Sequence, residues 1–189
     1  GSGIVLRLAD IFFDFKKVYG DGSLARELRT HVTATARKPF LLREMFELDA
    51  HHKVALGPFN RLLVDRLEGP NKGKLNLKLT GTLPLVEAAR IGALYHGIPD
   101  TPTLDRINAL HAKNVLSADE RDYLEGAFNH ITNLVLRQQT RDFLATGQVG
   151  NHVAVEDMTR RERDMLVDGF RAIRQFRKRM RTELTGDLF

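Results

Sequence analysis

The chain has 189 residues, of which 42% are hydrophobic and 28% charged, and this length and composition suit one sizeable globular domain. It has no run of about 18 apolar residues, so the sequence predicts no membrane span. The absence of cysteine excludes disulfides and thiolate chemistry and favours a reducing cytoplasm. The net charge of +5 favours anionic partners such as nucleotides, acidic proteins or nucleic acid.

The N-terminal stretch predicts an isolated strand followed by helices. Residues 1–3, Gly-Ser-Gly, are typical of an expression-tag remnant. Residues 11–15, "IFFDF", predict a short buried strand that carries Asp14 between two phenylalanines. Helices are then expected over residues 24–36 and 39–53, the second beginning at a proline.

Residues 59–66 and 74–79 predict a small β-hairpin joined by the turn-rich "LEGPNKG". In the second strand, leucines alternate with lysine and asparagine, so one face is apolar. Because a two-stranded hairpin is marginal alone, we expect its leucine face to pack against helices.

From Pro84 onward the pattern is helical. Gly97 is expected just past the end of the first of these helices, and Ser117 with Glu120 forms a capping box at the start of a long one. The sequence therefore predicts a mainly α fold, an antiparallel helical bundle with a small β-hairpin and a short N-terminal strand. The expected helices cover residues 84–96, 103–112, 117–145 and 156–182, with a loop over 147–153.

Arg90 stands in the middle of the most apolar helix of the chain. A buried guanidinium costs several kcal/mol unless it is paired. Glu87, three residues earlier, can supply a structural ion pair on the same side of the helix. Alternatively, Arg90 faces a cleft and binds a phosphate or carboxylate through its fork of donors. Arg106 on the next expected helix and Arg137 late in the long one also lie close to the inward-facing positions of their helices. Polar residues on the inward faces of three helices favour a shared polar pocket.

No motif for metal or nucleophilic chemistry is complete. The seven histidines lack ligand spacing, and "GDGS" at residues 20–23 lacks the lysine of a phosphate-binding loop. Asp14 by itself cannot hold the metal pair that nucleotidyl transfer uses. It is either structural or one member of a carboxylate set completed elsewhere.

Several segments in order resemble a known family. They are "LNLKLTGTLPLVEAARIGALYHGI", "TPTLDRINAL", "LRQQ" and "GNHVAVEDMTRRERDMLVDGFRAIRQFRK". From about Ala36 to the C-terminus the chain resembles the nucleotidyltransferase substrate-binding domain. That domain is the C-terminal part of bacterial signal-transduction proteins that also carry CBS and cyclic-nucleotide-binding domains, and the family is similar to protein-PII uridylyltransferase.

The resemblance implies a division into residues 1–22, a tag and the edge of a nucleotidyltransferase domain, and residues 23–189, the helical substrate-binding domain. It assigns Asp14 as the third metal-binding carboxylate of the preceding domain. At Asn76 the sequence departs from the aspartate expected in this family. The implied cleft residues bind the nucleotide's phosphates or the acceptor, or brace the domain interface. These residues are Lys78, Arg90, Thr103, Arg106 and Arg137.

The resemblance also implies partners and cofactors. The expected partners are the N-terminal nucleotidyltransferase domain, the upstream sensor domains and a nucleotide or protein acceptor, with a homodimer left open. Mg²⁺ and a nucleoside triphosphate are expected in the intact protein, with neither bound to this part, which is expected to be inactive alone. The alternative is a non-catalytic regulatory module that relays signals from the sensor domains. Nucleic-acid binding through the basic residues 160–181 is a third and weaker hypothesis.

Overall fold

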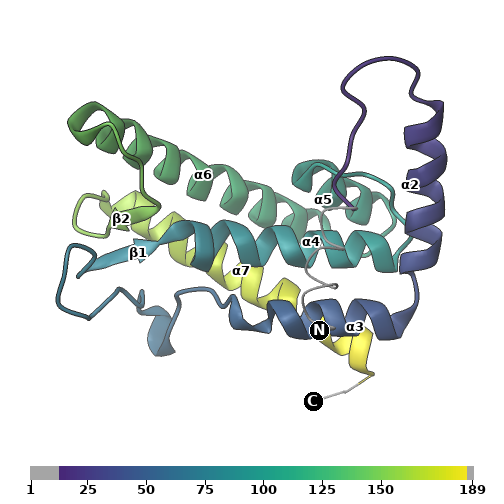
Figure 1. Ribbon diagram of the computed structural model, residues 1–189. Coiled ribbons are helices and arrows are strands. Elements are labelled where there is room, and N and C mark those ends of the chain that lie inside the picture. The colour runs from purple at the N-terminus through teal and green to yellow at the C-terminus, as the bar shows by residue number, and fades with distance from the viewer. Residues whose placement is uncertain (1–12, 187–189) are drawn as a thin grey trace. The chain divides into compact units, whose positions relative to one another are not determined.

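The computed structural model describes residues 13–186 and is helical over most of them (Figure 1). Contacts divide the chain into two compact units. The first comprises residues up to 51, residues 86–121 and residues from 177 onward. The second comprises residues 52–85 and 122–176.

The elements confirm a mainly α fold with a small antiparallel β element. Among the described helices, none is long and apolar enough to cross a bilayer. The helices are α2 (Ser23–Ala36), α3 (Pro39–Leu48), α4 (Leu83–Tyr95), α5 (Thr103–Ala112), α6 (Ala118–Thr146) and α7 (Arg160–Thr185). The strands are β1 (Lys74–Asn76) and β2 (His152–Ala154).

The predicted hairpin between residues 59–66 and 74–79 is wrong in its pairing. β1 pairs with β2, with Leu75 opposite Val153, so the predicted loop 147–153 supplies a strand. No strand forms over the predicted span 59–66, which begins with Phe59 and Asn60 in left-handed backbone angles, φ 53° and 60°. Only fragments of pairing remain there: Leu62 makes an isolated antiparallel bridge to Leu56, and Asp65 exchanges backbone hydrogen bonds with Gly73 and Lys74. Residues 78–82 form a π-helical turn instead of continuing the strand.

The predicted N-terminal strand is also corrected where it can be seen. Residues 13 and 14 form a turn and a bend, and residues 11 and 12 lie outside the described part. The carbonyl oxygen of Phe13 and the carboxylate of Asp14 both accept hydrogen bonds from an arginine side chain. This stretch is therefore held by side-chain donors rather than by a strand ladder.

Helix ends follow local signals. Gly97 has φ +66° and closes α4 with hydrogen bonds from Ile98 N to Ala93 O and from Gly97 N to Leu94 O. The Ser117–Glu120 capping box is confirmed in both directions. A second box, in which Thr159 and Glu162 cap each other, explains why α7 begins at Arg160 and not at residue 156.

Each unit has its own core. In the first unit, α4 is buried along nearly all of its length, including Ala89 and Ile91. In the second unit, α6 and α7 approach closely where Gly169 faces Ala127. Tyr123 on α6 and Met165 on α7 are exposed and lie outside this core.

Candidate functional site

Asp14 is bound by two arginines from two helices of the first unit. Arg90 on α4 donates from Nη2 and Nε to Asp14 Oδ2, at 2.5 and 3.2 Å. Arg106 on α5 donates from Nη2 to Asp14 Oδ1 at 2.6 Å. We term these three residues the Asp14 clamp. It ties the irregular segment around residue 14 to α4 and α5.

The Arg106 guanidinium is satisfied almost entirely by the protein. The residue is only 1% exposed, yet it also donates to the carbonyl oxygens of Asp100 and Phe13, at 2.7 and 3.1 Å. Burial lowers the pKa of Arg106, and the neighbouring charge of Asp14 opposes that shift. Three acceptors offset the cost of taking this charge out of water.

The clamp keeps Asp14 ionised. Partial burial raises the pKa of its carboxyl, but the hydrogen bonds and charges of Arg90 and Arg106 outweigh that effect. The net result is a pKa below the ordinary range. Two positive charges and two engaged carboxylate oxygens do not fit a divalent cation, which needs a free anionic oxygen and an electronegative surrounding. As arranged, the clamp is not a magnesium site.

The other predicted site residues have separate places. Thr103 begins α5 in the first unit and is half-buried. Lys78 is exposed at the start of the π-helical turn in the second unit. Arg137, also in the second unit, donates to Glu162 at 2.5 Å. Of the predicted residues, the structure therefore joins Asp14, Arg90 and Arg106 into one cluster.

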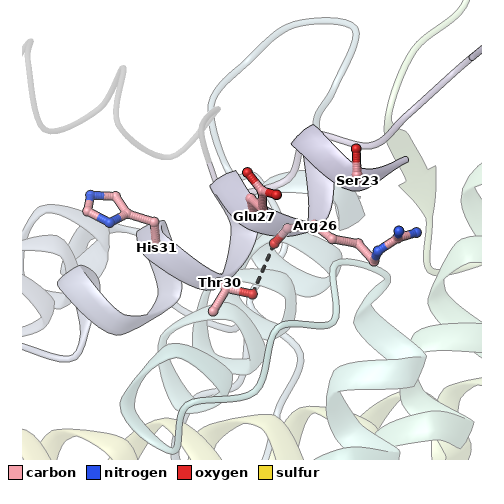
Figure 2. A pocket seen from close by; sticks show the side chains of 5 residues that line it. All are labelled: Ser23, Arg26, Glu27, Thr30 and His31. Atoms are coloured by element: carbon pink, nitrogen blue, oxygen red, sulfur yellow. Dashed lines mark hydrogen bonds between the residues drawn. The ribbon is translucent and has the colours of Figure 1, made fainter. Parts of the chain in front are cut away.

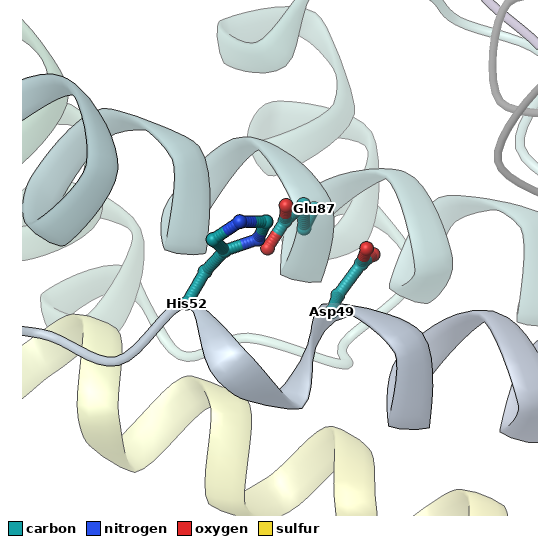
Figure 3. Close-up of side chains that lie close together, drawn as sticks. All are labelled: Asp49, His52 and Glu87. Carbon is teal, nitrogen blue, oxygen red and sulfur yellow. The ribbon is translucent and has the colours of Figure 1, made fainter.

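Glu87 has a different strong partner from the one expected. It is buried and accepts a hydrogen bond from Arg177 Nη1 at 3.4 Å, while Arg177 Nη2 donates to Asp49 O at 3.0 Å. Figure 3 shows the carboxylates of Asp49 and Glu87 on adjacent elements of the first unit. Burial, reinforced by the charge of Asp49, raises the pKa of Glu87 to about 8 against the opposing effect of Arg177.

Two depressions of the first unit were missed from the sequence. One is lined by Arg37, Tyr95, His96 and Lys113. The other lies along α2 and is drawn in Figure 2, where the lining side chains all come from one helix. Since Arg37 and Lys113 stand 76 positions apart, no local motif could have brought them together. Their only sequence signal is a cation just after a helix end.

Comparison with known proteins gives one match. Residues 39–184 match the family described as "Putative nucleotidyltransferase substrate binding domain". Arg90 and Arg106 lie inside this region, and Asp14 lies before it. No curated protein and no solved structure matches the chain. Because the matched region spans most of the sequence, the chain belongs to the nucleotidyltransferase substrate-binding domain family.

Proposed function

We propose that this chain binds and positions a substrate for nucleotidyl transfer in a bacterial cytoplasmic signalling protein similar to uridylyltransferases. The observation that supports this role is the convergence of Arg90 and Arg106 on Asp14. The resemblance assigns the Asp14 segment to the edge of the catalytic domain. The two arginines then brace that segment against the substrate-binding helices, which is the second of the two roles predicted for them.

Bracing has a direct chemical consequence. Nucleotidyl transfer needs the acceptor and the nucleoside triphosphate held in one geometry, and rigid positioning lowers the entropic part of the barrier. We propose Mg²⁺ and a nucleoside triphosphate as components of the intact reaction. Lys78, Thr103 and Arg137 remain the proposed substrate contacts outside the clamp.

The test compares this chain with the intact protein. Calorimetry with nucleoside triphosphates and Mg²⁺ is expected to show weak binding to the chain, with dissociation constants on the order of a millimolar. A radiolabel transfer assay is expected to show turnover by the intact protein and none by the chain. Robust transfer by the chain alone would contradict a role limited to binding and positioning.

One observation favours a second candidate, a non-catalytic regulatory module. Both oxygens of Asp14 are held by arginines, so this carboxylate is occupied by a structural task. In that case the intact protein transfers no nucleotide, and the helices carry signals from sensor domains to a partner. The same transfer assay on the intact protein separates the two, because measurable turnover eliminates the regulatory candidate.

A further inference from the structure

A pocket of about 530 Å³ opens in the first unit where three helices end. Arg37 directly follows α2, Tyr95 is the last residue of α4 and His96 follows it, and Lys113 directly follows α5. Its volume lies within the range of small-molecule sites. Two of its four lining side chains, Arg37 and Lys113, are cations.

These two cations have no partner in the part of the chain that the structure describes. Neither the Arg37 guanidinium nor the Lys113 ammonium makes a hydrogen bond or ion pair with residues 13–186. A cationic side chain near the C-terminal end of a helix ordinarily interacts with the last carbonyl groups of that helix. Arg177 does so here by donating to Asp49 O just after α3, whereas the side chains of Arg37 and Lys113 bind no carbonyl oxygen of residues 13–186. Both side chains are exposed and line the pocket.

The remaining contacts fix the pocket walls. Gly97 has φ +66°, and a Cβ at this position would lie 3.4 Å from Cδ and Nη1 of Arg37. Arg37 therefore lies across the glycine backbone. His96 Nε2 is 3.2 Å from Glu183 Oε2, and the rings of Tyr95 and His96 meet edge to face at 5.1 Å. The aromatic wall is held in place while the two cations stay available.

The pocket and the Asp14 clamp draw on different parts of α5. Arg106 is buried within the helix, whereas Lys113 is exposed directly after its end. Arg106 is already paired with Asp14, so the charge that this part of the chain offers to the pocket is that of Lys113.

We propose that the pocket lined by Arg37, Tyr95, His96 and Lys113 binds the polyphosphate group of a nucleoside triphosphate. Arg37 offers a planar fork of donors and Lys113 a point charge, a pairing suited to adjacent phosphates. The choice of a nucleotide rests on the proposed function. Binding of a polyphosphate rests on the pocket alone. The resemblance implied other residues for the phosphates or the acceptor, namely Lys78, Arg90, Thr103, Arg106 and Arg137. Of these, Arg90 and Arg106 donate to Asp14 here.

The test is a phosphorus NMR titration of the whole chain with inorganic triphosphate and with UTP. The variant Arg37→Gln/Lys113→Gln removes both free charges. The matched control, Arg43→Gln/Lys178→Gln, removes two exposed cations of the same unit that have no partner among the described residues. We expect the pocket variant to weaken both ligands by about tenfold or more and the control by less than about twofold, as expected for charge-assisted contacts. Circular dichroism confirms that both variants fold.

Three results would overturn the pocket assignment. The first is that both variants weaken ligand binding equally, which would mean that surface charge alone attracts the ligands. The second is that the pocket variant binds both ligands as tightly as the unmodified chain. The third is that neither ligand binds to the unmodified chain. The proposed function fails separately. If the intact protein transfers nucleotide but the pocket variant binds both ligands as tightly as the unmodified chain, that function stands and the pocket is refuted. If triphosphate binds through these residues but the intact protein transfers nothing, the pocket stands and the catalytic role is refuted.

Discussion

At the scale of single residues, the arginine in the most apolar helix is explained by a contact far along the chain. Arg90 binds a carboxylate 76 positions earlier, and its side chain is only 12% exposed. The ion pair expected within the helix, with Glu87, is not its closest one, since Glu87 is bonded to Arg177. The i,i+3 spacing rule pointed to Glu87 as the partner of Arg90, whereas the closest acid to Arg90 in the structure is Asp14.

The clamp should contribute measurably to stability. Asp14→Asn removes the charge that Arg90 and Arg106 share, and we expect the free energy of unfolding to fall by about 1.5–3 kcal/mol, the range for hydrogen bonds to charged groups. In urea denaturation, combining it with Arg90→Gln should cost less than the sum of the two single changes. Asp105→Asn, an exposed acid on α5, is the control and should change little. Strict additivity of the double variant would show that the clamp is not energetically coupled.

At the scale of elements, the sequence carries local signals for where helices begin but none for which helices contact each other. The two capping boxes, at Ser117 and Thr159, fix where α6 and α7 begin through bonds between residues three apart. Sequence inspection identified the first and overlooked the second, which carries the same signature. The close approach of α6 and α7 has no such signature, because it depends on which glycine faces which helix.

Two glycines of the second unit provide a matched test of that packing. A Cβ at Gly169 on α7 would lie 2.8 Å from Ala127 Cβ, whereas a Cβ at Gly126 on α6 would meet nothing within 4 Å. We expect Gly169→Ala to destabilise the chain by about 1–3 kcal/mol through overpacking. Gly126→Ala should stabilise it by up to about 1 kcal/mol, the helix propensity difference. Thermal unfolding measures both, and equal effects of the same sign would contradict this packing.

At the scale of the whole molecule, the positive charge has no aromatic platform on α7. The chain carries +5 and a pI near 9.7, and α7 is rich in arginine. The aromatic residues of that helix, Phe170 and Phe176, are buried in the core. Bases stack on exposed aromatic side chains, so α7 can offer nucleic acid only charge. This favours small phosphorylated ligands over specific nucleic-acid recognition.

Overall stability should depend on pH through one buried acid. Glu87 has a pKa of about 8 in the folded chain against an ordinary value of 4.5. Between these values the folded state holds a proton that the unfolded state has lost, so the free energy of unfolding falls as pH rises from about 4.5 to about 8. The largest fall in the free energy of unfolding that this shift allows is on the order of 5 kcal/mol, since each unit of pKa corresponds to about 1.4 kcal/mol.

Urea denaturation of the unmodified chain and Glu87→Gln at pH 5, 6.5 and 8 checks this dependence. The glutamine variant mimics the protonated acid, so much of the decline between pH 5 and pH 8 should disappear. Glu47→Gln, at an exposed position on α3, should leave the decline unchanged. A decline of the same size in all three proteins would assign the pH dependence to other groups.

The sequence by itself determined the features that depend on near neighbours. It determined that the fold is mainly helical, where α4 and α6 begin or end, and which family the ordered motifs resemble. Periodicity and capping act over three to seven residues, so they can be read without knowing the fold.

Only the tertiary structure decided which distant groups meet. It paired β1 with β2, joined Asp14 to Arg90 and Arg106, gave Glu87 to Arg177, and gathered Arg37 with Lys113. The type of each residue sets its charge and its hydrogen-bonding capacity. Which partner it binds depends on burial and geometry once the helices have packed. For that reason the sequence could not show that Arg90 and Arg106 both bind Asp14.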